Sequence, residues 1–99
     1  DRGDVIWVDL DPTQGREQRG RRPALVLSAA KTNRITGLHL VVPITSKVKN
    51  LLHETVFELD GQAACALASH LRSMDLATRR PKLLAKASEN VVKEVTARA

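Results

Sequence analysis

The fold of this chain is decided by GDVIWVDLDPTQGREQRGRRPALVLS, residues 3–28. The apolar, β-branched run at residues 4–10 ends at an Asp-Pro turn signal and predicts a strand. Residues 11–22 carry a proline, glycines and several charged side chains, which predicts an exposed loop. The apolar run at residues 23–28 predicts a second strand. Functional side chains of this stretch are therefore expected on the loop between the two strands.

Further short strands are predicted downstream. Pro43 lies inside the apolar run LHLVVPITS, and because proline cannot donate a ladder hydrogen bond, it argues for an edge strand or a strand end. An Asp-Gly pair after HETVFEL marks a turn. In chain order, the expected segments are a connector at 29–37, a strand at 38–46, a loop at 47–52 and a strand at 53–59.

The last third of the chain is ambiguous in one place. Residues 63–74, AACALASHLRSM, fit a helix by their alanine and leucine content, and they also fit a strand with one face of small residues. A turn is expected at residues 78–81, and Ser88 is a suitable N-cap for a final helix. The apolar stripe of that helix would consist of Val91, Val92 and Val95. Many short strands with one terminal helix indicate a compact, mainly β barrel with short helices.

The composition predicts one domain with a small core. Ninety-nine residues are expected to form a single domain, residues 1–99, because two halves would each be too small to fold alone. The only aromatic residues are Trp7 and Phe57, which are expected in the mainly aliphatic core or in a dimer interface. Self-association would bury additional apolar surface. The single cysteine, Cys65, excludes an internal disulfide and does not suggest a zinc site.

The charge balance points to a polyanionic partner. Lys and Arg number 16 against 11 Asp and Glu, which gives a net charge of +5. Nucleic acid is the first partner to consider, and simple solubility is the alternative explanation of the charge. No signal peptide or membrane-length apolar run is present, so the cytoplasm is the expected location. The chain starts at Asp1 rather than at methionine, which leaves the native N-terminus open.

Two blocks of sequence resemble a known family. The first is a G-D-apolar-apolar-W-V strand followed by a D-P-x-x-G-x-E-Q-x-G-x-R-P loop, and the second is V-P-I-T-S at residues 42–46. Together they resemble the signature of the MazF/PemK toxins, strongly over residues 3–46 and loosely after residue 59. The resemblance implies an SH3-like barrel of the MazF/PemK/CcdB type with a C-terminal helix, and a homodimer. It also implies sequence-specific cleavage of single-stranded mRNA without a metal ion or other cofactor, and neutralisation by an antitoxin.

The same resemblance assigns a catalytic set by position. Arg22 matches the family's catalytic arginine, Thr45 its catalytic threonine, and Glu17 an acid of the same loop. In the reaction a ribose 2′-hydroxyl attacks the neighbouring phosphorus and the 5′-oxygen leaves, so negative charge builds on the phosphoryl oxygens. A guanidinium and a hydroxyl can donate to that charge. Because arginine holds its proton too tightly to be a good base, Arg22 is expected to stabilise the transition state, while Glu17 or a water it orients takes the proton.

Further contacts to RNA are expected around this set. The loop expected at residues 11–22 carries Arg16, Arg19, Arg21 and Arg22. Their guanidinium groups could bind phosphate, each through two parallel hydrogen bonds. The alternative is an ordinary solvated loop whose charges pair with one another. Ser69 and His70 stand where relatives show Asp and Gln, which leaves substrate choice open. Relatives often carry aromatics in the loop after Ser46, and this chain has lysines there, so charge and hydrogen bonds are expected to replace stacking. The residues expected to contact RNA are Arg16, Gln18, Arg21, Ser46, Lys47, Lys49 and His70.

Three alternatives stay open at this point. Two of the histidines His39, His53 and His70 could act as acid and base for the same reaction, although the first lies in an apolar strand. A CcdB-like toxin that poisons gyrase would share the barrel, but the intact E-Q-x-G-x-R-P and P-I-T-S blocks argue against it. The altered Ser69 and His70 suggest a nucleic-acid-binding barrel with impaired catalysis.

The antitoxin is expected to bind through charge. An acidic, partly disordered segment would cover the basic groove, and the complementary charge would speed association. A second basic cluster either extends the RNA track or binds this segment. It consists of Arg79, Arg80 and Lys82.

Overall fold

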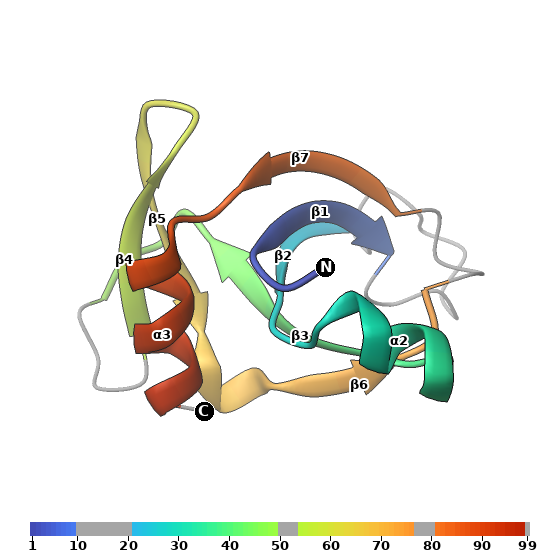
Figure 1. Ribbon diagram of the computed structural model, residues 1–99. Helices are drawn as coiled ribbons and strands as arrows, with labels where there is room; N and C mark the ends of the chain where they lie inside the picture. Colours follow the sequence, from blue (N-terminus) through green and yellow to red (C-terminus); the bar gives the residue numbers. More distant parts are fainter. Residues whose placement is uncertain (10–20, 50–53, 77–80, 99) are drawn as a thin grey trace.

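A computed structural model describes residues 1–9, 21–49, 54–76 and 81–98 of the chain (Figure 1). The elements, in chain order, are β1 (Asp4–Asp9), β2 (Arg21–Val26), α2 (Ala30–Thr36), β3 (His39–Thr45), β4 (Glu54–Leu59), β5 (Gln62–Leu67), the 3₁₀ turn η2 (Ala68–His70), β6 (Arg72–Met74), β7 (Lys82–Lys86) and α3 (Glu89–Arg98). The strands form an antiparallel sheet that curls like part of a barrel wall, and α3 packs against the β4–β5 end of it (Figure 1). The prediction of a mainly β fold with short helices is therefore confirmed.

The two strands of the opening stretch are also confirmed, with one correction. β1 and β2 pair antiparallel, with Val5 opposite Leu25 and Val8 opposite Arg22. β2 begins at Arg21, whereas the apolar pattern predicted a start two residues later. The backbone of a strand can pair whatever side chain it carries, so the apolar run marks only the buried part of β2. Arg21 and Arg22 therefore lie on a strand and not on the loop.

The strand order places β3 in the middle of the sheet. The order is β4-β5-β3-β2-β1-β7, with β6 as a further partner of β3. The expectation that Pro43 marks an edge or a strand end is thus wrong, because β3 is central. It pairs with β6 through residues 39–41 and with β5 at Ile44 and Thr45. Pro43 falls between these two partners, where a missing N–H breaks no ladder hydrogen bond.

The two faces of β1, β2 and β3 bury different apolar clusters. Alternate side chains of a strand point to opposite faces, and both faces are covered here. The first cluster joins the sheet to α3 through Val92 and Val95. The second cluster consists of Ile6, Val8, Ala24, Val26, Val41, Met74 and Leu76.

A tight hairpin resolves the ambiguous segment at residues 63–74. Asp60 and Gly61 have φ angles of 54° and 77°, and they connect Leu59 to its cross-strand partner Gln62. Two central residues with positive φ match the right-handed twist of paired strands and favour Asp-Gly. The hairpin forces the segment after it back along β4 as β5, followed by η2 and β6. The strand alternative is therefore correct, and alanine content alone misleads because these small side chains pack in a sheet.

The segment at residues 29–37, predicted as a connector, contains the helix α2. Gly37 ends it in the left-handed conformation at φ 75°, and its N–H donates to the Asn33 carbonyl at 2.9 Å. Asn33 is buried, and its side chain accepts a hydrogen bond from the Ser28 hydroxyl. That hydroxyl in turn accepts the Leu40 N–H at 3.0 Å. These hydrogen bonds hold α2 next to the start of β3.

Replacing Asn33 with alanine is expected to lower the free energy of unfolding by about 2 kcal/mol, because the buried Ser28 hydroxyl loses its acceptor. Denaturant titration measures this loss. Thr32→Ala, at an exposed position of the same helix, is the matched control and should cost less than about 0.5 kcal/mol. Equal losses in the two variants would contradict a role for the Asn33 side chain.

The final helix forms as predicted. The Ser88 hydroxyl accepts the Val91 N–H at 3.2 Å, which is the contact of an N-cap. Val92 and Val95 are buried and Val91 is half-buried, so the three valines form the expected stripe. Neither α2 nor α3, the α-helices of the described ranges, is long and apolar enough to span a bilayer. Most of the turn expected at residues 78–81 lies outside the described residues.

Candidate active site

Arg22 and Thr45 lie at the same end of two neighbouring strands. Between β2 and β3, Ala24 is paired with Pro43 in an antiparallel register. Arg22 and Thr45 each lie two residues beyond this pair, toward the same end of the two strands. Side chains two residues apart along a strand point to the same face, and Ala24 and Pro43 are directly opposite on one face. Arg22 and Thr45 are therefore on the face of Ala24 and Pro43, at one end of the β2–β3 pair.

This face changes from apolar to polar along the strands. Ala24 and Val26 are buried in the second cluster, whereas Arg22 is exposed and Thr45 is half-buried. Val8, opposite Arg22 on β1, belongs to the same buried cluster. The cluster thus ends where the two polar side chains begin. An exposed guanidinium supported by a packed sheet can bind an anion from solvent without a large loss of backbone freedom.

The Thr45 hydroxyl is oriented by the turn that follows it. Its Oγ1 accepts the backbone N–H of Lys47 at 3.2 Å. A hydroxyl has one proton and two lone pairs, so accepting this N–H leaves the proton available to donate elsewhere. The side chains of Ser46, Lys47 and Lys49 are exposed around it. This end of β3 can therefore present one hydroxyl donor and two ammonium groups to a phosphate chain.

A buried polar group lies behind the same turn. Glu54, at the start of β4, is only 6% exposed, and its Oε1 accepts the Lys49 N–H at 3.0 Å. Cys65, on β5 directly opposite Thr45, is a free cysteine whose Sγ lies 3.9 Å from the Lys47 carbonyl oxygen. Burial raises the pKa of the Cys65 thiol, and the charge of Glu54 and a hydrogen bond to it raise that pKa further. The thiol therefore stays protonated at neutral pH.

The expected site residues are brought together only in part. Those that gather at this end of the β2–β3 pair are Arg22, Thr45, Ser46, Lys47 and Lys49. Arg21 is opposite Asp9, one position before Arg22 on the same strand. His70 is exposed at the end of η2, next to exposed Ser69. Arg16, Glu17, Gln18, Arg79 and Arg80 lie outside the described residues.

The structure does not favour the histidine alternative. His39 lies at the opposite end of β3 from Thr45. Burial lowers the pKa of His39, the positive N-terminal amino group lowers it further, and Asp75 acts in the opposite direction. Its Nδ1 is buried with no hydrogen-bond partner within the described ranges. His39 is therefore a neutral side chain of the fold, and His53 lies outside the described residues.

Two residues with a place at this site were missed by the sequence reasoning. Arg72 on β6 is opposite Val41, so its exposed side chain is on the face that carries Arg22 and Thr45. In the sequence, Arg72 was indicated only as a basic residue shortly after the altered Ser69–His70 pair. Glu54 had no signal beyond a carboxylate at the start of an apolar strand, and only pairing with β5 shows that it is buried.

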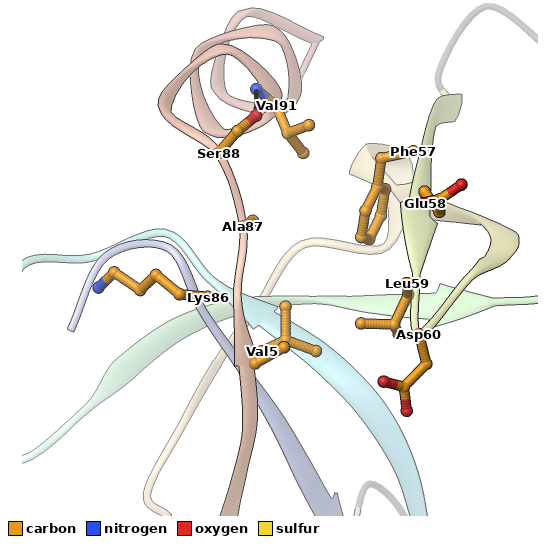
Figure 2. Close-up of a pocket in the computed structure, with 10 residues that line it drawn as sticks. Val5, Phe57, Glu58, Leu59, Asp60, Lys86, Ala87, Ser88 and Val91 are labelled. Carbon is orange, nitrogen blue, oxygen red and sulfur yellow. Dashed lines mark hydrogen bonds between the residues drawn. The ribbon is translucent and has the colours of Figure 1, made fainter.

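A cavity of about 340 Å³ lies elsewhere, between β4, β7 and the start of α3 (Figure 2). Phe57, Leu59 and Val91 form its apolar wall, and the Glu58 side chain points away from it on the other side of β4 (Figure 2). An apolar hollow of this kind does not suit a polyanion. Among the described residues, no cluster of His, Cys, Asp and Glu side chains could hold a metal ion.

The sequence and the fold both have counterparts among known proteins. Residues 1–99 match the family model described as "PemK-like, MazF-like toxin of type II toxin-antitoxin system". The endoribonuclease toxin MazF of Escherichia coli K12 is 46% identical over 74 residues, which cover 75% of this chain and 67% of that protein. Crystal structures of Deinococcus radiodurans MazF and of a MazE–MazF complex superpose with TM-scores of 0.85 and 0.82. Their sequences are 41% and 37% identical, and the matches cover 99% of this chain and 90% and 88% of theirs. The predicted MazF-type fold is thus confirmed.

Proposed function

Because the chain belongs to the PemK-like, MazF-like toxins of type II toxin–antitoxin systems, we propose that it cuts single-stranded mRNA at specific sequences without a metal ion. Its relatives are named endoribonucleases, and the chain is an endoribonuclease toxin of this family. The observation that supports the chemistry is that Arg22 and Thr45 lie at the same end of the paired strands β2 and β3, each two residues beyond the Ala24–Pro43 pair. A scissile phosphodiester bound there would contact both side chains.

Arg22 and Thr45 would stabilise the transition state by donating hydrogen bonds. As the 2′-oxygen attacks phosphorus and the 5′-oxygen leaves, negative charge grows on the two non-bridging oxygens. The guanidinium of Arg22 supplies two parallel donors and the Thr45 hydroxyl a third. These donors supply the charge stabilisation that a metal ion provides in other nucleases. Arg22 would also protonate the leaving 5′-oxygen, which becomes strongly basic as its bond to phosphorus breaks.

Glu17 would accept the 2′ proton, directly or through a water, since a protonated guanidinium cannot accept one. Replacing Glu17 with glutamine is expected to lower the single-turnover rate and to remove the rise of that rate with pH that deprotonation of the carboxylate causes. Rate constants measured from pH 4 to pH 9 with one RNA substrate test this. Identical profiles for the variant and the wild type would rule out Glu17 as the base.

The rest of the RNA would follow the positive surface around the catalytic pair. Lys47 and Lys49 are exposed beside Thr45, and Arg72 offers a further guanidinium on the same face. We place Ser46, Arg16, Gln18, Arg21 and His70 in the same track. The net charge of +5 also suits an acidic antitoxin segment, and a MazE–MazF complex is among the similar solved structures. A cytoplasmic homodimer is the form that we propose for the toxin.

One experiment separates this function from its alternatives. The purified protein is incubated with a long single-stranded RNA in the presence of a metal chelator, and the fragment ends are mapped. Discrete fragments with a common sequence at their ends support the proposal. Intact RNA together with gyrase inhibition would indicate CcdB-like action, and intact RNA that remains bound would indicate an impaired barrel. Cleavage that the chelator abolishes would contradict the metal-independent mechanism.

A further inference from the structure

The buried carboxylate of Glu54 has no part in the reaction described above. It is the first residue of β4 and is buried there. A buried carboxylate is unfavourable unless hydrogen bonds satisfy it, and its Oε1 receives one from the Lys49 amide at 3.0 Å. The amide belongs to residues 46–49, the turn that follows Thr45. Glu54 therefore binds the turn that orients the catalytic hydroxyl.

The turn is held at three points by three different strands. The Lys47 N–H donates to Thr45 Oγ1 on β3 at 3.2 Å. The Cys65 thiol on β5 lies 3.9 Å from the Lys47 carbonyl oxygen, within the range of a weak S–H donor. Glu54 on β4 receives the Lys49 N–H. Of the three, the bond to Glu54 has a carboxylate acceptor, and charge-assisted hydrogen bonds are the stronger kind.

We propose that Glu54 is a positioning residue of the ribonuclease site, which acts through the turn on the Thr45 hydroxyl. By fixing the Lys49 amide, it keeps the Lys47 N–H on one lone pair of that hydroxyl. The hydroxyl proton then faces outward, toward the place that the phosphate would occupy. Without this anchor the turn has more conformations, and the hydroxyl points at the phosphate for a smaller part of the time. This inference rests on the proposed role of Thr45.

The test uses two near-isosteric substitutions that differ in the acceptor. Glu54→Gln keeps an oxygen for the Lys49 amide, whereas Glu54→Met fills the same space without one. In single-turnover cleavage, E54M is expected to be about 10-fold or more slower than wild type and E54Q to retain most of the rate. Affinity for RNA with a 2′-deoxy cleavage site should change much less than the rate. Glu58→Ala, at an exposed position of the same strand and face, is the matched control and should cleave at the wild-type rate.

A double-mutant cycle with Thr45 separates positioning from a merely structural role. In a Thr45→Val background, where no hydroxyl is left to orient, E54M should change the rate by less than about threefold. Additive losses would overturn the inference, because they would show that Glu54 acts independently of the hydroxyl. A wild-type rate for T45V alone would instead refute the proposed role of Thr45.

Amide hydrogen exchange on the unmutated protein gives a second measurement that does not depend on whether the variants fold. The Lys47 and Lys49 amides are expected to exchange slowly, because each is a hydrogen-bond donor in this turn. Slow exchange at both supports the inference. Exchange at the rate of an unstructured peptide at Lys49 would overturn it, since the carboxylate would then not hold the Lys49 amide.

Discussion

Replacing Arg22 with alanine is expected to reduce the single-turnover rate of RNA cleavage by about 100-fold or more. The guanidinium stands exposed at the edge of the second apolar cluster, where its two parallel donors can reach a bound phosphate. Both donors gain strength as negative charge develops, so the loss falls on the rate more than on binding. Rates measured with saturating enzyme, together with affinities for RNA carrying a 2′-deoxy cleavage site, separate the two effects.

Two further variants show whether the effect belongs to this guanidinium. Arg22→Lys keeps the charge but loses the planar pair of donors, so its rate should fall between those of wild type and R22A. Arg34→Ala removes an exposed guanidinium from α2, at the other end of the β2–β3 pair, and should leave the rate unchanged. A wild-type rate for R22A, or an equal loss in R34A, would show that Arg22 contributes only to the general positive charge.

Much of the fold follows from local patterns in the sequence. The apolar runs locate β1 and the buried part of β2, and Asp60-Gly61 specifies a hairpin by its positive φ angles. Ser88 marks the start of α3 because a hydroxyl there satisfies a helix N–H. Each of these signals acts within a few residues along the chain, and for that reason it can be read from sequence.

The parts that were predicted wrongly depend on partners distant in sequence. Pro43 is tolerated in a central strand because it lies where β3 stops pairing with β6 and starts pairing with β5. No local sequence pattern shows where this change of partner occurs. Glu54 is buried only because β5 and the turn at residues 46–49 close over it. The proposed catalytic pair was predicted through family resemblance, and the pairing of β2 with β3 brings Arg22 and Thr45 to the same end of the two strands.

Thr45→Val is expected to be the second large loss, about 100-fold in the single-turnover rate. Valine has nearly the same shape as threonine but no hydroxyl, so the substitution removes the donor at this half-buried position without opening a space. Thr45→Ser keeps the hydroxyl and its bond from the Lys47 amide and should cleave at close to the wild-type rate. Thermal unfolding of each variant checks that the fold is intact.

The comparison of serine with valine also tests how the hydroxyl works. The non-bridging phosphate oxygens carry no proton, so the hydroxyl can act only as a donor toward them, and the Lys47 N–H on one lone pair leaves its proton available for this. Its effect should appear in the rate with little change in affinity for 2′-deoxy RNA. An equal loss in rate and affinity for T45V would instead mean that the hydroxyl binds substrate and transition state alike. A T45S variant as slow as T45V would mean that the methyl group, and not the hydroxyl, is what the site requires at this position.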